Sequence, residues 1–251
     1  MAPVDDTVLA ALMTAILAGL GGLLVPSLIR RVPEPPQAGP AQDAQDDGPT
    51  TDEPPKTPYA EIAARPGLGL RSALVSAVVG AVLGGATGLD WSLAWLLPLT
   101  PVAVALSVVD WHTRLLPRVV VVPATLAALA VVTVVGLATG ERTALLGALG
   151  GMVGLRTFFW VLWFIRSAGM GFGDVRLAAL VGLVLGWEGL DVLVLGAWIG
   201  FVSFALPGVA LAVVRRDRSL LRKPFPYGPF MVGGALAGLV WGTALAGRVW
   251  G

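Results

Sequence analysis

The chain contains no cysteine and only one histidine, His112, among its 251 residues. The absence of cysteine excludes disulfide bonds and thiolate metal sites, and a single histidine excludes a histidine-rich metal site. Charged residues make up only 13% of the chain and leave a net charge of +1, which gives no reason to expect a nucleic-acid partner. We therefore expect a protein without a bound metal ion that does not act on nucleic acid.

Apolar residues, in contrast, are abundant. They make up 56% of the chain, and the mean hydropathy is +0.81. Apolar runs of about 20 residues, the length that crosses a bilayer as a helix, recur along most of the sequence. The sequence thus predicts an all-α, polytopic transmembrane helical bundle of about eight spans. The expected spans are 7–29, 70–89, 91–109, 119–138, 143–165, 175–187, 190–214 and 230–249.

Three regions follow from this pattern. Residues 1–31 form the expected first transmembrane span, which we interpret as a retained span because no basic residue precedes it. Residues 32–69 are rich in proline and acidic side chains and poor in large apolar ones, a composition typical of a disordered loop. Residues 70–251 form the expected seven-span core.

The distribution of basic residues predicts the orientation. With the N-terminus outside and the eight spans alternating, 14 of the 17 lysine and arginine residues fall on the cytoplasmic side. Basic residues are enriched in the cytoplasmic loops of membrane proteins, so this orientation is strongly favoured. It places two acids, Asp110 and Asp174, at the cytoplasmic ends of spans.

A glycine-rich turn precedes the second of these acids. Gly169, Gly171 and Gly173 alternate with other residues before Asp174. The glycines indicate unusual backbone angles, and the plainer interpretation of Asp174 is the N-cap of the following helix. The helix expected at 175–186 is only about 18 Å long, shorter than the roughly 30 Å hydrocarbon core. We therefore expect Asp174 to lie at membrane depth beside a wet cavity.

Asp110 ends an earlier apolar stretch, and its plainer interpretation is an interfacial acid paired with Arg114. If Asp110 instead meets Asp174, the two carboxyl groups can share one proton, as in aspartic proteases. Two other classes of protein remain open. The acids could couple protons or cations in a small transporter, or the chain could be a non-catalytic assembly protein.

Three motifs together resemble the type IV prepilin peptidases, a family of polytopic membrane aspartic proteases. They are Asp110 followed by Leu116-Pro117, then Gly171-Phe172-Gly173-Asp174 with the basic Arg176, then Pro226-Tyr227-Gly228-Pro229. The resemblance implies that Asp110 and Asp174 are the catalytic pair and that no cofactor is needed. It also implies a bacterial cytoplasmic-membrane enzyme, surrounded by lipid and facing the cytoplasm. The implied substrate is a prepilin or pseudopilin precursor, used in type IV pili or protein secretion.

The chain departs from this family at its first loop. Two-function members carry paired Cys-x-x-Cys motifs there, beside an N-methyltransferase region, whereas residues 32–69 contain no cysteine. We therefore expect leader-peptide cleavage without methylation.

Overall fold

The computed structural model describes residues 4–34, 57–165, 170–216 and 225–249, and these residues form helices joined by short connections, with no β-strand among them. The helices are α1 (Val4–Gly22), α2 (Val25–Arg30), α3 (Tyr59–Ala63), α4 (Leu68–Thr87), α5 (Leu93–Thr113), α6 (Arg118–Thr139), α7 (Arg142–Ile165), α8 (Phe172–Glu188), α9 (Leu190–Val214) and α10 (Gly228–Val249). The predicted all-α class is confirmed.

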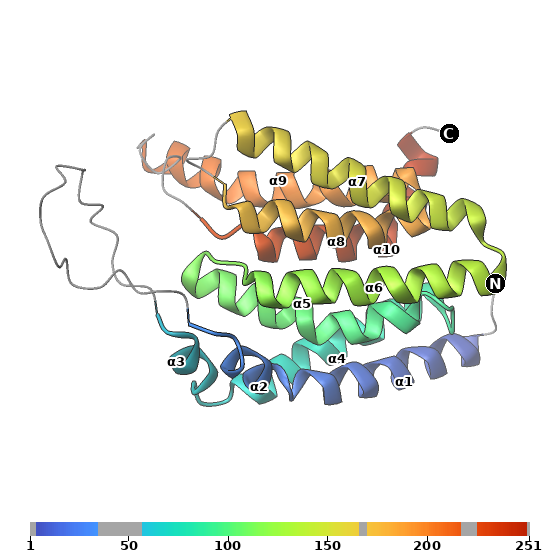
Figure 1. The fold of residues 1–251 in the computed structure, drawn as a ribbon, viewed down its shortest axis with the longest axis horizontal. Helices are drawn as coiled ribbons and strands as arrows, with labels where there is room; N and C mark the ends of the chain where they lie inside the picture. Colours follow the sequence, from blue (N-terminus) through green and yellow to red (C-terminus); the bar gives the residue numbers. More distant parts are fainter. Residues whose placement is uncertain (1–3, 35–56, 166–169, 217–224, 250–251) are drawn as a thin grey trace, which may run out of the picture.

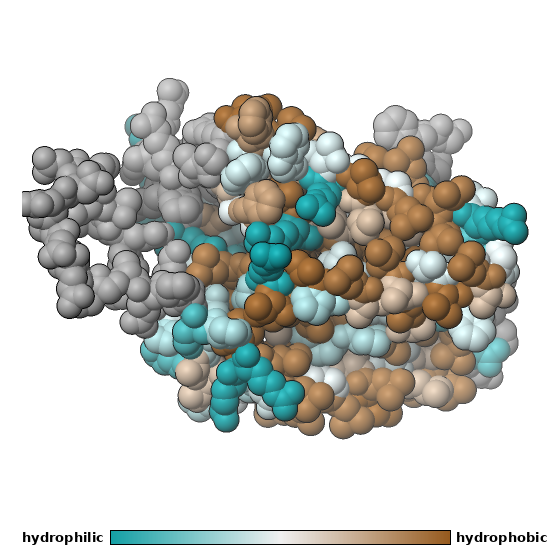
Figure 2. All heavy atoms as spheres, in the orientation of Figure 1, coloured by the Kyte–Doolittle hydropathy of each residue, from teal (hydrophilic) through white to brown (hydrophobic). Residues whose placement is uncertain are grey.

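Eight of these helices are long and lie side by side in one bundle, while α2 and α3 are short and sit together at one end (Figure 1). That end also contains the end of α5 and the beginnings of α6, α8 and α10. Most of the face seen in Figure 2 is covered by apolar side chains. An apolar exterior of this kind is expected of a bundle whose solvent is lipid.

Six helices in the described part of the chain are long and apolar enough to cross a membrane: α1 continued by α2, then α4, α5, α6, α7 and α9. The bundle is therefore a transmembrane one, as predicted. Helix α8 has 17 residues, and the apolar stretch of α10 that could be assessed covers only Gly228–Gly242. The count of eight spans and the outside N-terminus stay predictions.

Glycines lie at the close contacts of three antiparallel helix pairs, α7–α8, α9–α10 and α1–α4. A β-carbon built on Gly151 of α7 would collide with the carbonyl oxygen of Gly182 in α8. In the α9–α10 hairpin, a β-carbon on Gly234 would lie 2.5 Å from Cα of Gly200. Gly80 of α4 approaches the backbone of Thr14 in α1 in the same way. Small residues at such crossings permit close backbone packing in lipid, where no hydrophobic effect drives helices together.

Helix α8 occupies the centre of the bundle. All its residues from Asp174 to Gly186 are buried except Arg176, and it packs against α6, α7, α9 and α10. A helix that is apolar on every side must be surrounded by protein or lipid, and here protein surrounds it. The buried Asp174 side chain of α8 is therefore held away from the lipid.

Part of the segment 32–69, which the sequence predicts to be disordered, is helical. Residues 57–69 contain α3 and the beginning of α4, so this part of the expectation is wrong, while residues 35–56 lie outside the described residues. The error has a local cause. Tyr59, Ile62 and Ala63 supply buried apolar surface that packs against α2 and α5, although the segment as a whole is polar.

Candidate active site

Asp110 lies in the last turn of α5 and is only 3% exposed. Its Oδ2 atom accepts a hydrogen bond of 2.8 Å from the backbone N–H of Gly228, which is 118 residues further along the chain. Gly228 is the first residue of α10, so the carboxylate meets the end of a helix where free N–H groups and the helix dipole favour an anion. The segment 226–229 thereby holds the first acid in place.

The glycine at position 228 is required by this contact. A β-carbon there would lie 2.8 Å from Oδ2 and 3.3 Å from Cγ of Asp110. Any larger residue would push the carboxylate away from the backbone amide that binds it. The two neighbours in the motif, Pro226 and Tyr227, are buried, and Pro229 is half-buried.

Asp174 lies in the first turn of α8 and is 8% exposed. The expectation that Asp174 is the N-cap is wrong, because the N-cap residue is Gly171, three positions earlier. The Asp174 carboxylate instead folds back and accepts a hydrogen bond from the Gly171 backbone N–H. This is the return contact of a capping box, and it satisfies an N–H at the helix start. Gly169 lies outside the described residues.

Two further expectations about this turn are corrected. Gly171 has φ −71°, and neither it nor Gly173 has positive φ, so these glycines do not serve to permit unusual backbone angles. Gly173 is needed for close packing, since a β-carbon there would lie 2.8 Å from Cβ of Leu116. Helix α8 is also longer than expected, 17 residues or about 26 Å. Asp174 is buried because α8 is central and not because the helix is short.

The structure brings the three sequence motifs together at one end of the bundle. Asp174 lies near enough to Asp110 for the charges of the two carboxylates to interact. Asp174 also lies near enough to Tyr227 to interact electrostatically with its hydroxyl group. Leu116 packs on Gly173, and Pro117 is the N-cap residue of α6. Residues from α5, α8 and the start of α10 therefore surround one pair of buried carboxyl groups, in an otherwise apolar interior.

A sequence model of the type IV leader peptidase family matches residues 97–242, more than half of the chain and the part that contains all three motifs. The chain belongs to the type IV leader peptidase family.

Curated relatives of this leader peptidase family are similar over the same part of the chain. The prepilin leader peptidase/N-methyltransferase of Burkholderia pseudomallei (strain K96243) is 35% identical over 140 residues, which is 55% of this chain and 43% of the relative. The protein of that name from Pseudomonas putida is 35% identical over 148 residues, 59% of this chain and 49% of the relative. The chain thus spans about half the length of these relatives. No solved structure gives a significant match.

Within the segment 226–229, Tyr227 has the only polar side chain. Its hydroxyl is buried and has no hydrogen-bond partner in the described part of the chain. The ring packs among Phe159, Phe201 and Phe204, with centroid distances of 5.0 to 5.6 Å. These aromatic contacts fix the backbone just before Gly228, and so support the amide that binds Asp110.

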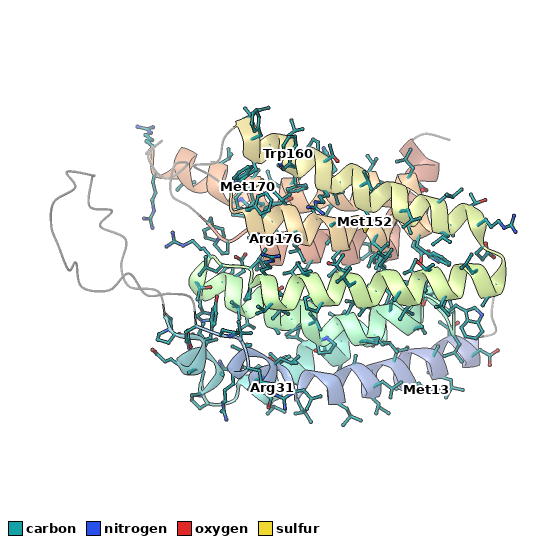
Figure 3. The ribbon with its side chains drawn as sticks, viewed as in Figure 1. Met13, Arg31, Met152, Trp160, Met170 and Arg176 are labelled. Atoms are coloured by element: carbon teal, nitrogen blue, oxygen red, sulfur yellow. The ribbon has the colours of Figure 1, made fainter. Side chains whose placement is uncertain are left out.

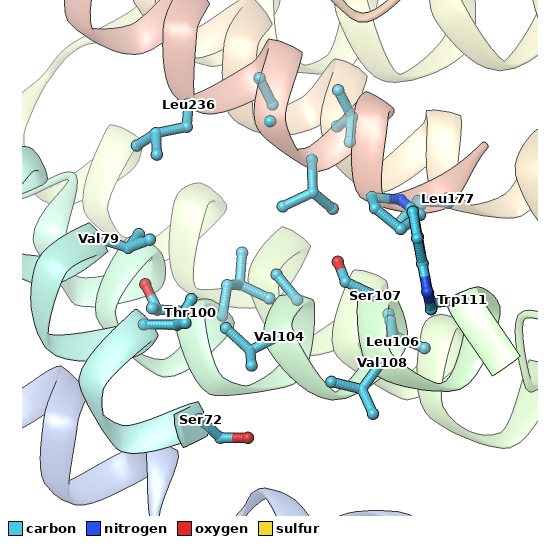
Figure 4. Close-up of a pocket in the computed structure, with 18 of the residues that line it drawn as sticks. Ser72, Val79, Thr100, Val104, Leu106, Ser107, Val108, Trp111, Leu177 and Leu236 are labelled. Carbon is cyan, nitrogen blue, oxygen red and sulfur yellow. The ribbon is translucent and has the colours of Figure 1, made fainter. Parts of the chain in front are cut away.

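A cavity of about 680 Å³ runs along the bundle between α4, α5, α8 and α10 (Figure 4). Neither acid lines it, but Trp111, the residue after Asp110, does. Its walls are almost entirely apolar, with Leu177 and Leu236 on one side and Val79 and Val104 on the other. Along α5 it is lined from Leu96 to His112, a rise of about 24 Å. The cavity therefore has nearly the length of a membrane crossing.

The polar end of this cavity contains Arg65, Arg71 and His112. The Nδ1 atom of His112 is 2.8 Å from the carbonyl oxygen of Val108, an acceptor, so Nδ1 carries the proton. Its Nε2 atom is then free to accept a hydrogen bond from Arg65. His112 thus ties the segment before α4 to the end of α5.

Sequence reasoning missed a second support for the end of α5. The carboxylate of Glu34 accepts hydrogen bonds of 2.9 Å from the N–H groups of Tyr59 and Ala60, at the start of α3. The buried Tyr59 side chain is in turn hydrogen-bonded to Thr113, one turn beyond Asp110. Burial and the nearby Glu34 carboxylate raise the pKa of the Tyr59 hydroxyl. Because Glu34 and Tyr59 are 25 positions apart, the sequence contains no local pattern that would reveal this cap.

Proposed function

We propose that this protein is a membrane-embedded aspartic endopeptidase that cleaves the leader peptide of type IV prepilin-like precursors. One observation carries the proposal. Two buried carboxyl groups interact at one end of a transmembrane bundle, and they belong to Asp110 and Asp174, which are 64 positions apart in the sequence. Membership in the leader peptidase family supports the reaction class. Because the chain spans about half of its relatives, the substrate and the activity of the whole protein belong to the proposal.

The proposed chemistry needs only the two acids and water. Two carboxyl groups whose charges interact do not both ionise easily, so the pair holds one proton. The ionised acid removes a proton from a water molecule as the water attacks the scissile carbonyl carbon. The other acid then protonates the leaving amide nitrogen, and the peptide bond breaks. The backbone N–H groups of Gly228 and Gly171 orient the two carboxylates for these steps.

The proposed substrate lies with its apolar helix in the cavity between α4, α5, α8 and α10. Three lining residues adjoin the acids: Trp111 follows Asp110, Leu177 lies three positions after Asp174, and Pro229 follows Gly228. A helix in the cavity would exchange lipid contacts for contacts with these walls, and would end where the acids are. A precursor would then be cut between its polar leader and its transmembrane helix.

The activity we propose is cleavage alone. The relatives' name includes an N-methyltransferase, but this chain has no cysteine with which to build the thiolate metal site of two-function members. We also propose that the acids face the cytoplasm of a bacterial inner membrane. Basic residues at the same end of the bundle support this orientation, among them Arg30, Arg31 and Arg118.

The test is to co-express a prepilin with the protein and determine the mature N-terminus by mass spectrometry. Asp110→Asn and Asp174→Asn should each reduce cleavage about 10²- to 10⁴-fold, the range expected for losing a positioned acid or base. Glu141→Gln, an exposed acid at the opposite end of the bundle, is the matched control and should cleave normally. Retained cleavage in either aspartate variant would contradict the proposal and return attention to a transporter or an assembly protein. A methylated N-terminus would contradict the peptidase-only part.

A further inference from the structure

Three arginines from three different helices gather on one face of the bundle. Arg118 is the first residue of α6, Arg156 lies in α7 and Arg176 lies in the first turns of α8. The charges of Arg118 and Arg156 both act on Arg176. The packing explains why: Leu116 contacts Gly173, and Leu155 contacts Gly182 across the α7–α8 hairpin. We call these three side chains the arginine cluster.

No carboxylate balances this cluster in the described part of the chain. The guanidinium of Arg176 lies over the ring of Phe172, 4.7 Å from its centroid, and none of the three arginines forms an ion pair with the residues described. The face therefore carries three like charges close together. Such an arrangement is unfavourable unless an anion binds there, because the arginines repel one another.

The cluster is surrounded by apolar, exposed side chains. Arg156 is exposed within a candidate membrane span, nine residues or about 14 Å before the end of α7. Val153 and Trp160 on the same helix are 60% and 45% exposed. Figure 2 shows hydrophilic side chains over α6, α7 and α8 with apolar side chains beside them, and Figure 3 labels Arg176 and Trp160 there. Charged side chains at such depth are costly and usually have a function.

The cluster is separate from the cavity assigned to the substrate. None of the three arginines lines that cavity, whereas Leu177, Leu180 and Val184 of α8 do. A helix bound in the cavity would therefore leave the cluster's charge unbalanced. The lipid that surrounds α6 and α7 can supply the balancing anion that the described residues do not.

We propose that the arginine cluster binds the phosphate group of an anionic phospholipid. Guanidinium groups match phosphate oxygens with paired, charge-assisted hydrogen bonds, and three of them can engage one phosphate from different sides. The acyl chains would lie on the exposed apolar surface of α6 and α7. The lipid would hold α6, α7 and α8 together beside Asp174. This site goes beyond the proposed peptidase activity and does not depend on it.

The test measures lipid retention by native mass spectrometry of the full chain in detergent, with phosphatidylglycerol or phosphatidylcholine added. The wild-type protein should retain phosphatidylglycerol preferentially. Each of Arg118→Gln, Arg156→Gln and Arg176→Gln should lower that retention about fivefold, the effect of one basic residue at an anionic surface. Arg142→Gln, at the other end of α7, is the matched control and should retain the lipid normally.

Several outcomes would overturn the proposal. Equal retention of the two lipids, or an equal loss in Arg142→Gln, would show that the cluster does not select an anionic lipid. Displacement of phosphatidylglycerol by millimolar inorganic phosphate would show a site for free phosphate instead. Displacement by an acidic substrate peptide would assign the cluster to a protein partner. Thermal unfolding in zwitterionic detergent should be the same in all variants, so a lost lipid cannot be attributed to misfolding.

Discussion

The two acids of the site are held in place in different ways. The Asp174 carboxylate is held by the start of its own helix, because the hydrogen bond that it accepts comes from the N–H group of Gly171, only three residues away. Asp110 is bound by Gly228, from another helix 118 residues further on. The first arrangement is local, because it forms together with the first turn of α8. The second exists only when α5 and α10 are assembled side by side. Half of the site is thus fixed by local geometry and half by assembly.

The supports behind the two acids differ in the same way. Behind Asp174, glycines on α7 and α8 bring two consecutive helices into backbone contact. Behind Asp110, the end of α5 is supported by Tyr59 of α3, whose helix is capped by Glu34. Changes on the Asp110 side should therefore reduce cleavage more than stability, whereas changes on the Asp174 side should reduce stability first.

The largest effect is expected at the long-range contact. Gly228→Ala places a β-carbon 2.8 Å from Oδ2 of Asp110, so the carboxylate must move by a large fraction of an ångström or more. Displacing a reacting group by about 1 Å can cost about 10²-fold in rate. We expect cleavage of a co-expressed prepilin to fall about 10²-fold while the protein still accumulates in the membrane.

Gly154→Ala is the control for this variant, because a β-carbon at position 154 meets nothing within 4 Å. It should cleave at the wild-type rate. Normal cleavage by Gly228→Ala would mean that Asp110 does not need the amide of Gly228, and would remove the distinction between the two acids.

A smaller effect is expected for the packing behind Asp174. Gly151→Ala drives a β-carbon into the backbone of Gly182, and inserting a methyl group into a tight core typically costs about 1–3 kcal/mol. The neighbouring Gly150 faces open space, so Gly150→Ala should be neutral or stabilise the helix by up to about 1 kcal/mol. Thermal unfolding in detergent measures both, and equal melting temperatures would contradict the proposed role of the α7–α8 contact.

The smallest effect is expected at the cap of α3. Glu34→Ala removes the acceptor for two backbone N–H groups, a loss that costs about 0.5–2 kcal/mol at helix N-termini. Because α3 supports α5 through Tyr59, cleavage should fall only a few-fold, with the global unfolding temperature nearly unchanged. Tyr59→Phe, which removes only the bond to Thr113, should produce a similar decrease. A decrease with Glu34→Ala but none with Tyr59→Phe would show that α3 does not act through Thr113.

Much of the bundle could be predicted from sequence because lipid imposes a simple rule. Apolar runs of membrane length must be helices, so the ends of α6, α7, α9 and α10 were predicted to within about two residues. The start of α8 was missed by three residues, because Phe172 and Gly173 gave no sign that the helix had already begun. Helix α3 was missed because its few buried residues are surrounded by a proline-rich, acidic segment.

Glycines four residues apart do not all lie at helix crossings. The pairs Gly147/Gly151 and Gly196/Gly200 lie at crossings, but Gly150 and Gly154 face open space. Gly182 and Gly186 complete the α7–α8 crossing. Spacing shows that two small residues share one face of a helix, and it contains no information about which helix faces them.

The sequence by itself determined the helical membrane fold and the identity of the residues in the three motifs. These depend on chemistry that is local along the chain: apolar length, charge at the ends of spans, and the residues beside each acid. Only the tertiary structure decided that Gly228 binds Asp110, that Gly173 packs on Leu116, and that three arginines share a face away from the cavity. The physical reason is that such contacts join helices far apart in sequence, and the packing of the whole bundle decides which side chains meet.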